Sequence, residues 1–271
     1  MINTEFERFL RLWGVEADGV PMETQSSWLL PVRRDRTPGM LKVLKQSSDE
    51  RDAAAMLRYF DGNGAVLLYE AQDNALLLER ASGPRSLMTM ATTGGDAQAA
   101  AVLAETVWKL HAKRERKRPE RMTPLWQWFS SLYDHAHAAP ILGRCANVAR
   151  NLIATESDVV PLHGDLHHDN VLDGGARGWL AIDPKALIGE RAYEVANLLG
   201  NPWPHGDIVH RPARMGRLAE LYAGRLGLDV RRVLAFAFAH AGLAASWDME
   251  DGGDPAYRLR CAEVLEAVIN G

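Results

Sequence analysis

Cysteine is scarce in this sequence of 271 residues, which contains only Cys145 and Cys261. The two lie far apart without a Cys-x-x-Cys spacing, so the sequence predicts neither a disulfide framework nor a zinc site. This scarcity is typical of a protein from a reducing compartment. An excess of charge is lacking as well, because the formal net charge is only −4. No overall basic field is present, and we expect no nucleic-acid partner.

Long hydrophobic runs and targeting signals are also lacking. The longest nearly apolar run, 233–247, contains His240 and is too short for a membrane span, so it predicts a buried helix. Residues 1–5 lack the basic start and apolar core of a signal peptide. With 47% hydrophobic and 24% charged residues, the composition is that of an ordinary globular enzyme. We expect a soluble, cytoplasmic protein that has no membrane partner and is monomeric by default.

The most informative stretch of the sequence is 163–184, where three polar residues have a spacing that suits one chemistry. Asp165 is followed five residues later by Asn170, and Asp183 comes thirteen residues after that. A carboxylate on the entering loop can accept a hydroxyl proton, and an amide oxygen beside a second carboxylate suits Mg²⁺. Base, metal amide and metal carboxylate in this order form the catalytic half of a protein-kinase-like phosphotransferase.

Two short apolar runs predict how Asn170 and Asp183 come together. Residues 171–172 and 179–182 flank a glycine-rich turn, a pattern that predicts a β-hairpin. A hairpin centred between residues 176 and 177 would place Asn170 opposite Asp183 at its open end. Separate turns and caps would explain each polar residue alone, but they do not explain the joint spacing.

The first part of the chain contains strand-like runs joined by short turns. Runs 19–22 and 28–32 flank the turn 23–27, which lacks the Gly-x-Gly-x-x-Gly of protein kinases. In a kinase-like lobe, this turn would cover the nucleotide phosphates with backbone N–H groups and the hydroxyls of Ser26 and Ser27. A hairpin without a ligand is the alternative interpretation.

A lysine in an apolar strand is the next candidate. Run 39–45 predicts a buried strand with Lys42 in its middle, and a charge there is costly unless it is paired or faces a ligand. We expect Lys42 to reach the α- and β-phosphates, with Lys45 the alternative if the register differs. Glu50, in the helix that follows, is either the ion-pair partner of Lys42 or part of a capping box begun by Ser47. An edge strand with solvent-facing lysines is the alternative.

A second strand pair, 65–70 and 75–79, leads into a segment that resembles a kinase hinge. In a two-lobed kinase, the backbone groups of Glu79, Arg80 and Ala81 would pair with the adenine edge. After about residue 81 the pattern becomes helical, with helices predicted over 96–111, 125–133, 141–153, 190–200, 214–226, 230–247 and 255–269. We therefore predict a nucleotide-binding lobe over 1–81 and a helical catalytic and substrate-binding lobe over 82–271.

Taken together, these features resemble the aminoglycoside phosphotransferase family, and most closely its streptomycin 6-phosphotransferase and hydroxyurea phosphotransferase branch. The resemblance covers about residues 19 to 250 and is strongest in the C-terminal motifs. The features that carry it are Lys42, the segment 79–82, His-Gly-Asp-Leu-His-His-Asp-Asn at 163–170, Gly-Trp-Leu-Ala-Ile-Asp-Pro at 178–184 and Ala-Ser-Trp at 245–247.

This resemblance implies an α+β, protein-kinase-like fold, with a small antiparallel-β N-lobe containing one helix and a larger helical C-lobe. It implies transfer of the γ-phosphate of ATP to a hydroxyl of a small molecule. Asp165 would orient or deprotonate that hydroxyl, while Asn170 and Asp183 would hold Mg²⁺. Such catalysis works by positioning and charge neutralisation. His163 would be structural, fixing Asp165 by packing and hydrogen bonding.

Acidic residues after the long apolar run suggest what the acceptor is. Asp248, Glu250 and Asp251 follow Trp247 in a stretch that the pattern predicts to be a loop. Aminoglycosides are polycations, and the guanidinium groups of streptomycin suit paired carboxylates, so these four residues are candidate substrate contacts. A solvated loop between two helices is the alternative.

We therefore expect an antibiotic-resistance kinase of the streptomycin/hydroxyurea type with a hydroxylated, possibly cationic, small-molecule acceptor. A housekeeping kinase for a sugar or amino alcohol is the second hypothesis. A non-catalytic nucleotide-binding module is the third, and the intact set of Asp165, Asn170 and Asp183 argues against it, because a binding module has no need of the base.

Overall fold

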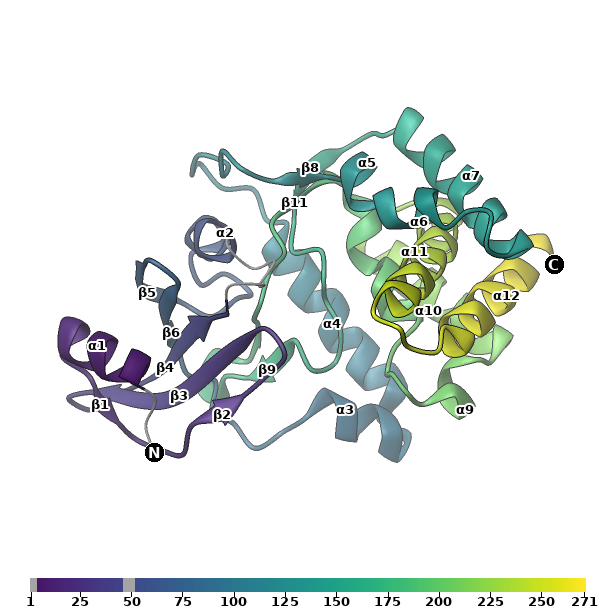
Figure 1. Ribbon diagram of the computed structural model, residues 1–271. Coiled ribbons are helices and arrows are strands. Elements are labelled where there is room, and N and C mark those ends of the chain that lie inside the picture. The colour runs from purple at the N-terminus through teal and green to yellow at the C-terminus, as the bar shows by residue number, and fades with distance from the viewer. Residues whose placement is uncertain (1–3, 46–51) are drawn as a thin grey trace.

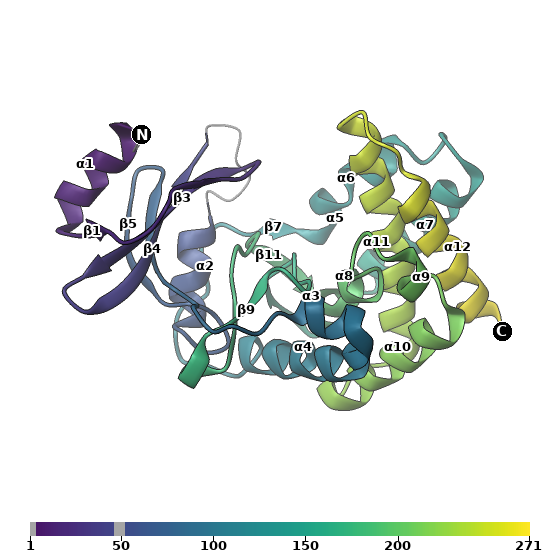
Figure 2. The ribbon, with the colours of Figure 1, turned by 90° about the horizontal axis from the view of Figure 1, so that it is seen from below.

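The computed structural model describes residues 4–45 and 52–271, and these form two lobes (Figure 1). The N-lobe, in purple and blue at the left of the figure, is built on a six-stranded sheet, and the C-lobe is mainly helical. Figure 2 shows the two lobes side by side, with the segment that contains β9 and β11 between them. Within the described residues, no helix is long and apolar enough to cross a membrane.

The N-lobe sheet has the strand order β1-β3-β4-β6-β5, with β2 also paired to β3, and every pairing is antiparallel. For the pairs β2–β3, β3–β4 and β5–β6, antiparallel pairing follows from the short turns that join the strands, because a parallel pair needs a long crossover. The elements of this lobe are α1 Thr4–Trp13, β1 Glu16–Ala17, β2 Met22–Glu23, β3 Ser27–Arg34, β4 Thr37–Leu44, α2 Ala53–Phe60, β5 Leu68–Gln72 and β6 Ala75–Glu79.

The two faces of this sheet belong to different apolar clusters. Side chains alternate along a strand, so Leu41 and Val43 of β4 point to the face that packs on Phe6 and Phe9 of α1. Lys42 lies between them and points to the opposite face, toward the C-lobe. The predicted strand and its buried lysine are confirmed, since Lys42 is only 2% exposed.

The C-lobe is organised around α11, a long helix that is apolar on most of its surface, as expected of a buried helix. Asp229 caps its N-terminus by accepting hydrogen bonds from the backbone N–H groups of Arg231 and Arg232. The helices of this lobe are α3 Leu87–Met90, α4 Asp96–Leu110, α5 Leu125–Trp128, α6 Ser130–Asp134, α7 Pro140–Ala154, α8 Ala196–Leu199, α9 Gly206–Val209, α10 Pro212–Leu226, α11 Val230–Glu250 and α12 Ala256–Asn270.

Short strands between these helices carry the motif residues. β9 and β10 form the predicted hairpin, and β7, β11 and β8 form a small sheet beside it. Their bounds are β7 Thr123–Pro124, β8 Val159–Leu162, β9 Val171–Asp173, β10 Trp179–Ala181 and β11 Leu187–Glu190.

The register of the β9–β10 hairpin differs from the prediction by one residue. Leu172 pairs with Leu180, so the hairpin is centred on Ala176, where the chain forms a 3₁₀ turn. Asn170 therefore lies opposite Ile182, whose N–H donates to the Asn170 carbonyl at 2.9 Å. The expectation that Asn170 faces Asp183 across the hairpin was wrong, because the 3₁₀ turn shifts the pairing.

Candidate active site

The loop that carries Asp165 is held by a buried carboxylate, Glu194, whose side chain is 0% exposed. Its oxygens accept the backbone N–H groups of His163 at 2.7 Å and Gly164 at 2.9 Å, and one of them lies 2.9 Å from His111 Nε2. Burial raises the pKa of Glu194, but the hydrogen bond and charge of His111 outweigh it, so the pKa lies below its ordinary value. An ionised carboxylate thus fixes the backbone of this loop.

The His163 side chain completes the loop from inside the protein. Its Nε2 donates to the Ile182 carbonyl at 2.7 Å, and its Nδ1 accepts the Asp165 backbone N–H at 3.3 Å. Gly164 has a φ of +84°, and a Cβ there would lie 2.6 Å from the Leu187 side chain, so only glycine fits. The structural role that the sequence predicted for His163 is the one that it has.

Two asparagines hold the Asp165 carboxylate. Asn197 Nδ2 donates to Oδ1 at 3.2 Å, and Asn170 Nδ2 donates to Oδ2 at 3.4 Å and to the Asp165 carbonyl at 2.8 Å. Asn197 lies on α8 and was not predicted. Because Asn170 bonds through its amide nitrogen, its amide oxygen remains available as a metal ligand.

The N-lobe lysine meets the second motif carboxylate at the junction of the lobes. Lys42 Nζ lies 2.7 Å from Asp183 Oδ1. Asp183 has a φ of +60°, a left-handed conformation that Asp tolerates better than most residues, and the position is one residue beyond the hairpin. Lys45 instead contacts Glu23 at 2.8 Å, so Lys42 is the lysine at this site. Glu50 lies outside the described residues.

The donor set suits a hard cation better than a transition metal. In the described parts of the chain, no cluster of three or more His, Cys, Asp or Glu side chains could hold a metal. Asn170 and Asp183 offer an amide oxygen and a carboxylate, and Mg²⁺ is commonly bound by one or two such groups together with water and substrate phosphates. The pair fits Mg²⁺ on the chemistry of its donors.

The turn between β2 and β3 is ordered by its own side chains. Thr24 N donates to the Ser27 carbonyl at 2.8 Å, and the two hydroxyls lie 3.0 Å apart, so the buried Ser27 hydroxyl is used within the turn. The Ser26 carbonyl accepts from Lys45 N at 2.9 Å. A phosphate contact by Ser26 or Ser27 stays a prediction. Because the Ser27 hydroxyl is already used within the turn, the backbone N–H groups of the turn are the better donors to a phosphate.

The hinge-like segment is anchored by its charged side chains. Glu79 accepts the Leu67 backbone N–H at 2.9 Å and forms an ion pair with Arg177 from the turn of the β9–β10 hairpin. Arg80 pairs with Asp18 at 2.6 Å. Arg80 and Ala81 follow the last residue of β6, so their backbone groups lie beyond the strand pairing. Adenine binding by this backbone stays a prediction.

A further set of contacts joins the β9–β10 hairpin to residues 83–85, the linker between the two lobes. The sequence did not predict these contacts. Asp173 at the end of β9 accepts two hydrogen bonds from the Arg85 guanidinium, both at 2.7 Å, and its carbonyl accepts the Gly83 N–H at 2.8 Å. A Cβ on Gly83 would lie 2.2 Å from Asp173 Cγ, so the close approach requires glycine. The strand that leads from Asn170 is therefore fixed to the interlobe linker.

A cavity of about 520 Å³ lies next to Asp165. The structure brings the predicted base and all four predicted substrate residues into its wall, namely Asp165, Trp247, Asp248, Glu250 and Asp251. Residues of the wall that the sequence did not reveal include Gln25, Trp128, Lys185, Asn197, His240 and Arg258. Lys185 directly follows the Asp-Pro of the motif, and this position beside the motif could have been used to predict it.

The acidic residues of this wall lie on a helix, and the predicted loop was wrong in this respect. α11 continues to Glu250, so Asp248 and Glu250 occupy its last turn and Asp251 is the C-cap. Carboxylates near a helix C-terminus interact unfavourably with the helix dipole, so these residues do not serve to stabilise the helix. Burial raises the pKa of Asp248, although Arg258, whose Nε lies 3.8 Å away, acts in the opposite direction.

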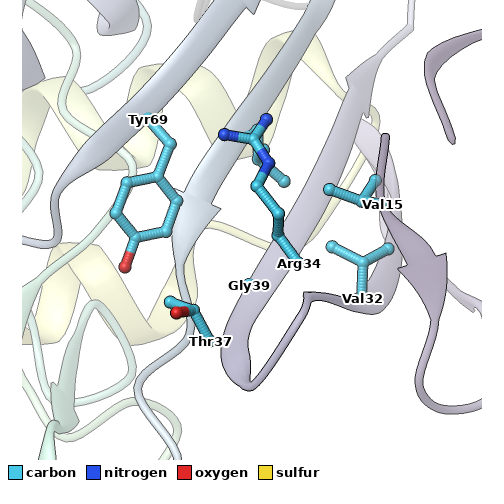
Figure 3. A pocket seen from close by; sticks show the side chains of 7 residues that line it. Val15, Val32, Arg34, Thr37, Gly39 and Tyr69 are labelled. Carbon is cyan, nitrogen blue, oxygen red and sulfur yellow. The ribbon is translucent and has the colours of Figure 1, made fainter. Parts of the chain in front are cut away.

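A smaller apolar pocket of about 210 Å³ lies on the outer face of the N-lobe sheet (Figure 3). In Figure 3 the Arg34 side chain lies between Tyr69 on one side and Val15 and Val32 on the other. All of its lining residues belong to the N-lobe and none is a motif residue, so this pocket is separate from the site around Asp165.

Comparison with known proteins shows the family to which this chain is similar. The family model described as aminoglycoside/hydroxyurea antibiotic resistance kinase matches residues 12–252. A streptomycin 3''-kinase from Klebsiella pneumoniae is 41% identical over 89% of this chain and 91% of its own length. A hydroxyurea phosphotransferase from Kitasatospora aureofaciens is 32% identical, with 95% and 76% covered, and a streptomycin 6-kinase from Streptomyces glaucescens is 30% identical, with 92% and 85% covered.

Solved structures support the fold. An aminoglycoside phosphotransferase, in the apo form of a thermostable mutant, superposes with a TM-score of 0.66 at 17% identity, covering 96% of this chain and 98% of that chain. The two-lobe, kinase-like α+β architecture expected from the sequence is confirmed. The chain belongs to the family of aminoglycoside/hydroxyurea antibiotic resistance kinases, and it is an enzyme that phosphorylates a hydroxyl group of a small molecule.

Proposed function

We propose that this kinase transfers the γ-phosphate of ATP to streptomycin, with the 3''-hydroxyl as the acceptor. The observation that carries the proposal is the 520 Å³ pocket in which Asp165 shares one wall with aromatic and acidic side chains from the end of α11. The 41% identity to a streptomycin 3''-kinase supports both the drug and the position of transfer.

Asp165 is the group that orients or deprotonates the acceptor hydroxyl. Asn197 and Asn170 restrict its carboxylate through both oxygens, which favours a productive approach of the hydroxyl and reduces the entropy lost in reaching it. Lys185 lies in the same pocket wall, and its ammonium would meet the phosphoryl group as this group approaches the acceptor.

The nucleotide occupies the junction of the lobes. Lys42 binds the α- and β-phosphates, and the backbone of 79–81, where we place the lobe boundary, contacts the adenine. Asn170 and Asp183 would hold Mg²⁺, which would supply positive charge against the phosphates. The 2.7 Å contact between Lys42 and Asp183 supports a common site for phosphate and metal, because it joins the two groups across the lobes.

The wall of the pocket suits streptomycin better than hydroxyurea. Drug-sized ligands occupy pockets of roughly 300–1,000 Å³, a range that includes this one, whereas hydroxyurea has only a few atoms and no charge. Asp248 and Glu250 in this wall would bind guanidinium groups through paired oxygens. The edge-on rings of Trp128 and Trp247, with centroids 5.1 Å apart, add apolar area beside them.

The test is a coupled ADP-release assay with Mg²⁺ and ATP against streptomycin, hydroxyurea, simple sugars and amino alcohols. We expect turnover of streptomycin, with the phosphate located on the 3''-oxygen by phosphorus–proton NMR of the product. Turnover of a sugar or amino alcohol without either drug would establish the housekeeping alternative. Nucleotide binding without any turnover would establish the non-catalytic one.

Asp165→Asn is the matched variant for the mechanism. It keeps the shape of the side chain and removes its basicity, so kcat falls by at least ~100-fold while the Kd for ATP is unchanged. A variant with normal kcat would exclude Asp165 as the base. Asp183→Asn instead shifts the Mg²⁺ titration of nucleotide binding to higher concentration, and an unchanged titration would exclude Asp183 as a metal ligand.

A further inference from the structure

A buried histidine of α11, His240, forms part of the acceptor-pocket wall, and no step of the proposed phosphoryl transfer requires it. The residue is only 7% exposed. Burial, with the nearby Arg258 charge, lowers the pKa of His240 to about 3, so the imidazole is neutral at physiological pH. Its hydrogen-bond partners therefore decide which ring nitrogen carries the proton.

A chain of two hydrogen bonds fixes that proton. Trp128 Nε1 donates to the Tyr193 hydroxyl at 2.7 Å, and this hydroxyl lies 3.0 Å from His240 Nδ1. The indole nitrogen is a donor only, so the Tyr193 oxygen accepts from it. In the described part of the chain, His240 Nδ1 is the one acceptor found for the Tyr193 proton, so Nδ1 accepts and the proton of the neutral imidazole lies on Nε2.

The imidazole lines the acceptor pocket, and within the described residues its Nε2 makes no hydrogen bond. The ring is also fixed in orientation, because Tyr193 and Trp247 pack edge-on against it with centroids 5.8 and 6.0 Å away. A single oriented N–H donor is thus held in the wall of the acceptor pocket.

We propose that His240 Nε2–H donates a hydrogen bond to an oxygen of the acceptor close to the hydroxyl that is phosphorylated. His240 is then a specificity-determining residue, and Tyr193 and Trp128 are positioning residues that act through it. The ligand class is an acceptor with a second hydroxyl, ether or carbonyl oxygen near its reacting hydroxyl. This inference rests on the proposed function only in that the pocket takes the acceptor.

A neutral donor at this place suits a cationic acceptor. An imidazolium would repel guanidinium groups that bind at Asp248 and Glu250 in the same wall, whereas a neutral imidazole binds oxygen without that repulsion. Arg258 in the same wall disfavours protonation of His240 further. The pocket therefore has two recognition parts, the acidic end of α11 for positive charge and His240 for oxygen.

The kinetic test compares His240→Phe, which removes the donor, with His240→Gln, which keeps an N–H donor on a side chain of similar length. Loss of one hydrogen bond of about 1.4 kcal/mol raises the acceptor KM about tenfold. We expect that rise in the Phe variant, an unchanged KM for ATP in both, and a rise of no more than about threefold in the Gln variant. An acceptor KM in the Phe variant equal to that of the wild type overturns the proposal.

The proton position is tested without any acceptor, by long-range ¹⁵N–¹H NMR of the histidine-labelled protein, with His240 assigned from its absence in His240→Gln. We expect the neutral Nε2–H pattern at pH 7, and a mixture of tautomers in Tyr193→Phe together with a raised acceptor KM. A neutral Nδ1–H pattern or an imidazolium in the wild type overturns the proposal. If streptomycin is not turned over but Nε2–H is found, the proposed substrate fails and the kinetic comparison is made with the acceptor that is turned over.

Discussion

Tyr193 and Glu194 are neighbours in the 3₁₀ turn Arg191–Val195, and they support two halves of the active site in different ways. The Glu194 carboxylate accepts two backbone N–H groups of the loop before Asp165 and contacts His111. The Tyr193 hydroxyl joins two neutral side chains beneath the acceptor pocket. One network is charged and fixes main chain, whereas the other is neutral and fixes a side-chain proton.

The difference follows from what each half must do. A catalytic loop needs its backbone held, and an ionised acceptor makes shorter and stronger hydrogen bonds to N–H groups than a neutral one. The support beneath the acceptor pocket is neutral, so His240 can donate to an oxygen without adding a further positive charge to the wall. The charged network is also the more costly to break, because loss of one partner leaves the others buried and uncompensated.

Glu194→Gln breaks the charged network and has the largest expected effect. Glutamine has one acceptor oxygen, so its amide N–H₂ would face the N–H of His163 or Gly164. We expect the free energy of unfolding, measured by urea titration at pH 7, to fall by about 3–5 kcal/mol, with kcat reduced as the loop moves.

Glu266→Gln is the matched control for Glu194→Gln. Glu266 pairs at 2.5 Å with Arg144, whose side chain is half exposed, and ion pairs open to solvent contribute little, so the loss should be under about 1 kcal/mol. Equal losses in the two variants would show that the buried charge of Glu194 has no special role.

Tyr193→Phe breaks the neutral network and should cost less. It leaves Trp128 Nε1 and His240 Nδ1 buried without a partner, and the free energy of unfolding should fall by about 2–3 kcal/mol. Tyr133→Phe is the control, because the Tyr133 hydroxyl makes no hydrogen bond within the described residues, and its removal should be nearly neutral. A larger loss in Tyr193→Phe than in Glu194→Gln would reverse the ranking of the two networks.

The pH dependence of stability separates the networks further. The pKa of His240 is lowered from 6.5 to about 3, so the unfolded chain binds more protons between these values and stability is lost as the pH falls below about 6.5. At pH 5 the expected loss from this group is about 2 kcal/mol. Urea titrations of His240→Gln at pH 7 and pH 5 should show a smaller fall than the wild type. Equal falls would show that His240 is not buried as a neutral group.

Glu194 responds in a different pH range. Its pKa is lowered in the folded protein, so its contribution is complete above the ordinary carboxyl value and is lost as the pH falls through the folded value. Between pH 7 and pH 5, Glu194 should therefore contribute little to the pH dependence, and the fall over that range is governed by buried histidines such as His240.

The sequence predicted the parts of the site that depend on local spacing. Lys42 in an apolar strand and the ordered set of Asp165, Asn170 and Asp183 lie at one place in the fold. The helix expected over 125–133 is instead divided into α5 and α6 at Phe129. The hairpin register was missed because the 3₁₀ turn at its tip is not distinguished by composition from a looser glycine-rich turn.

What the sequence did not reveal depends on contacts between distant segments. Tyr193 and His240 are 47 residues apart, and Arg85 and Asp173 are 88 apart, and neither pair has a local pattern. His240 was visible only as a polar interruption of an apolar run, which equally fits a histidine buried for packing. Its role as a donor follows only from the direction of the hydrogen bonds that reach it across the fold.

The acidic rim of the pocket gives the smallest expected effect, because its charges are exposed to water and screened by salt. Glu250 is exposed at the end of α11, so Glu250→Gln should raise the streptomycin KM only about two- to threefold at low salt, with no change in the KM for ATP. The rise should vanish at high salt, whereas the rise caused by His240→Phe should persist, since a buried hydrogen bond is not screened. Glu263→Gln on α12, away from the pocket, is the charge-matched control and should leave both constants unchanged. If the streptomycin KM of Glu250→Gln rises as much as that of His240→Phe and the rise persists at high salt, a main recognition group lies among the exposed acidic residues. The buried network around His240 would then not be the stronger determinant of acceptor binding.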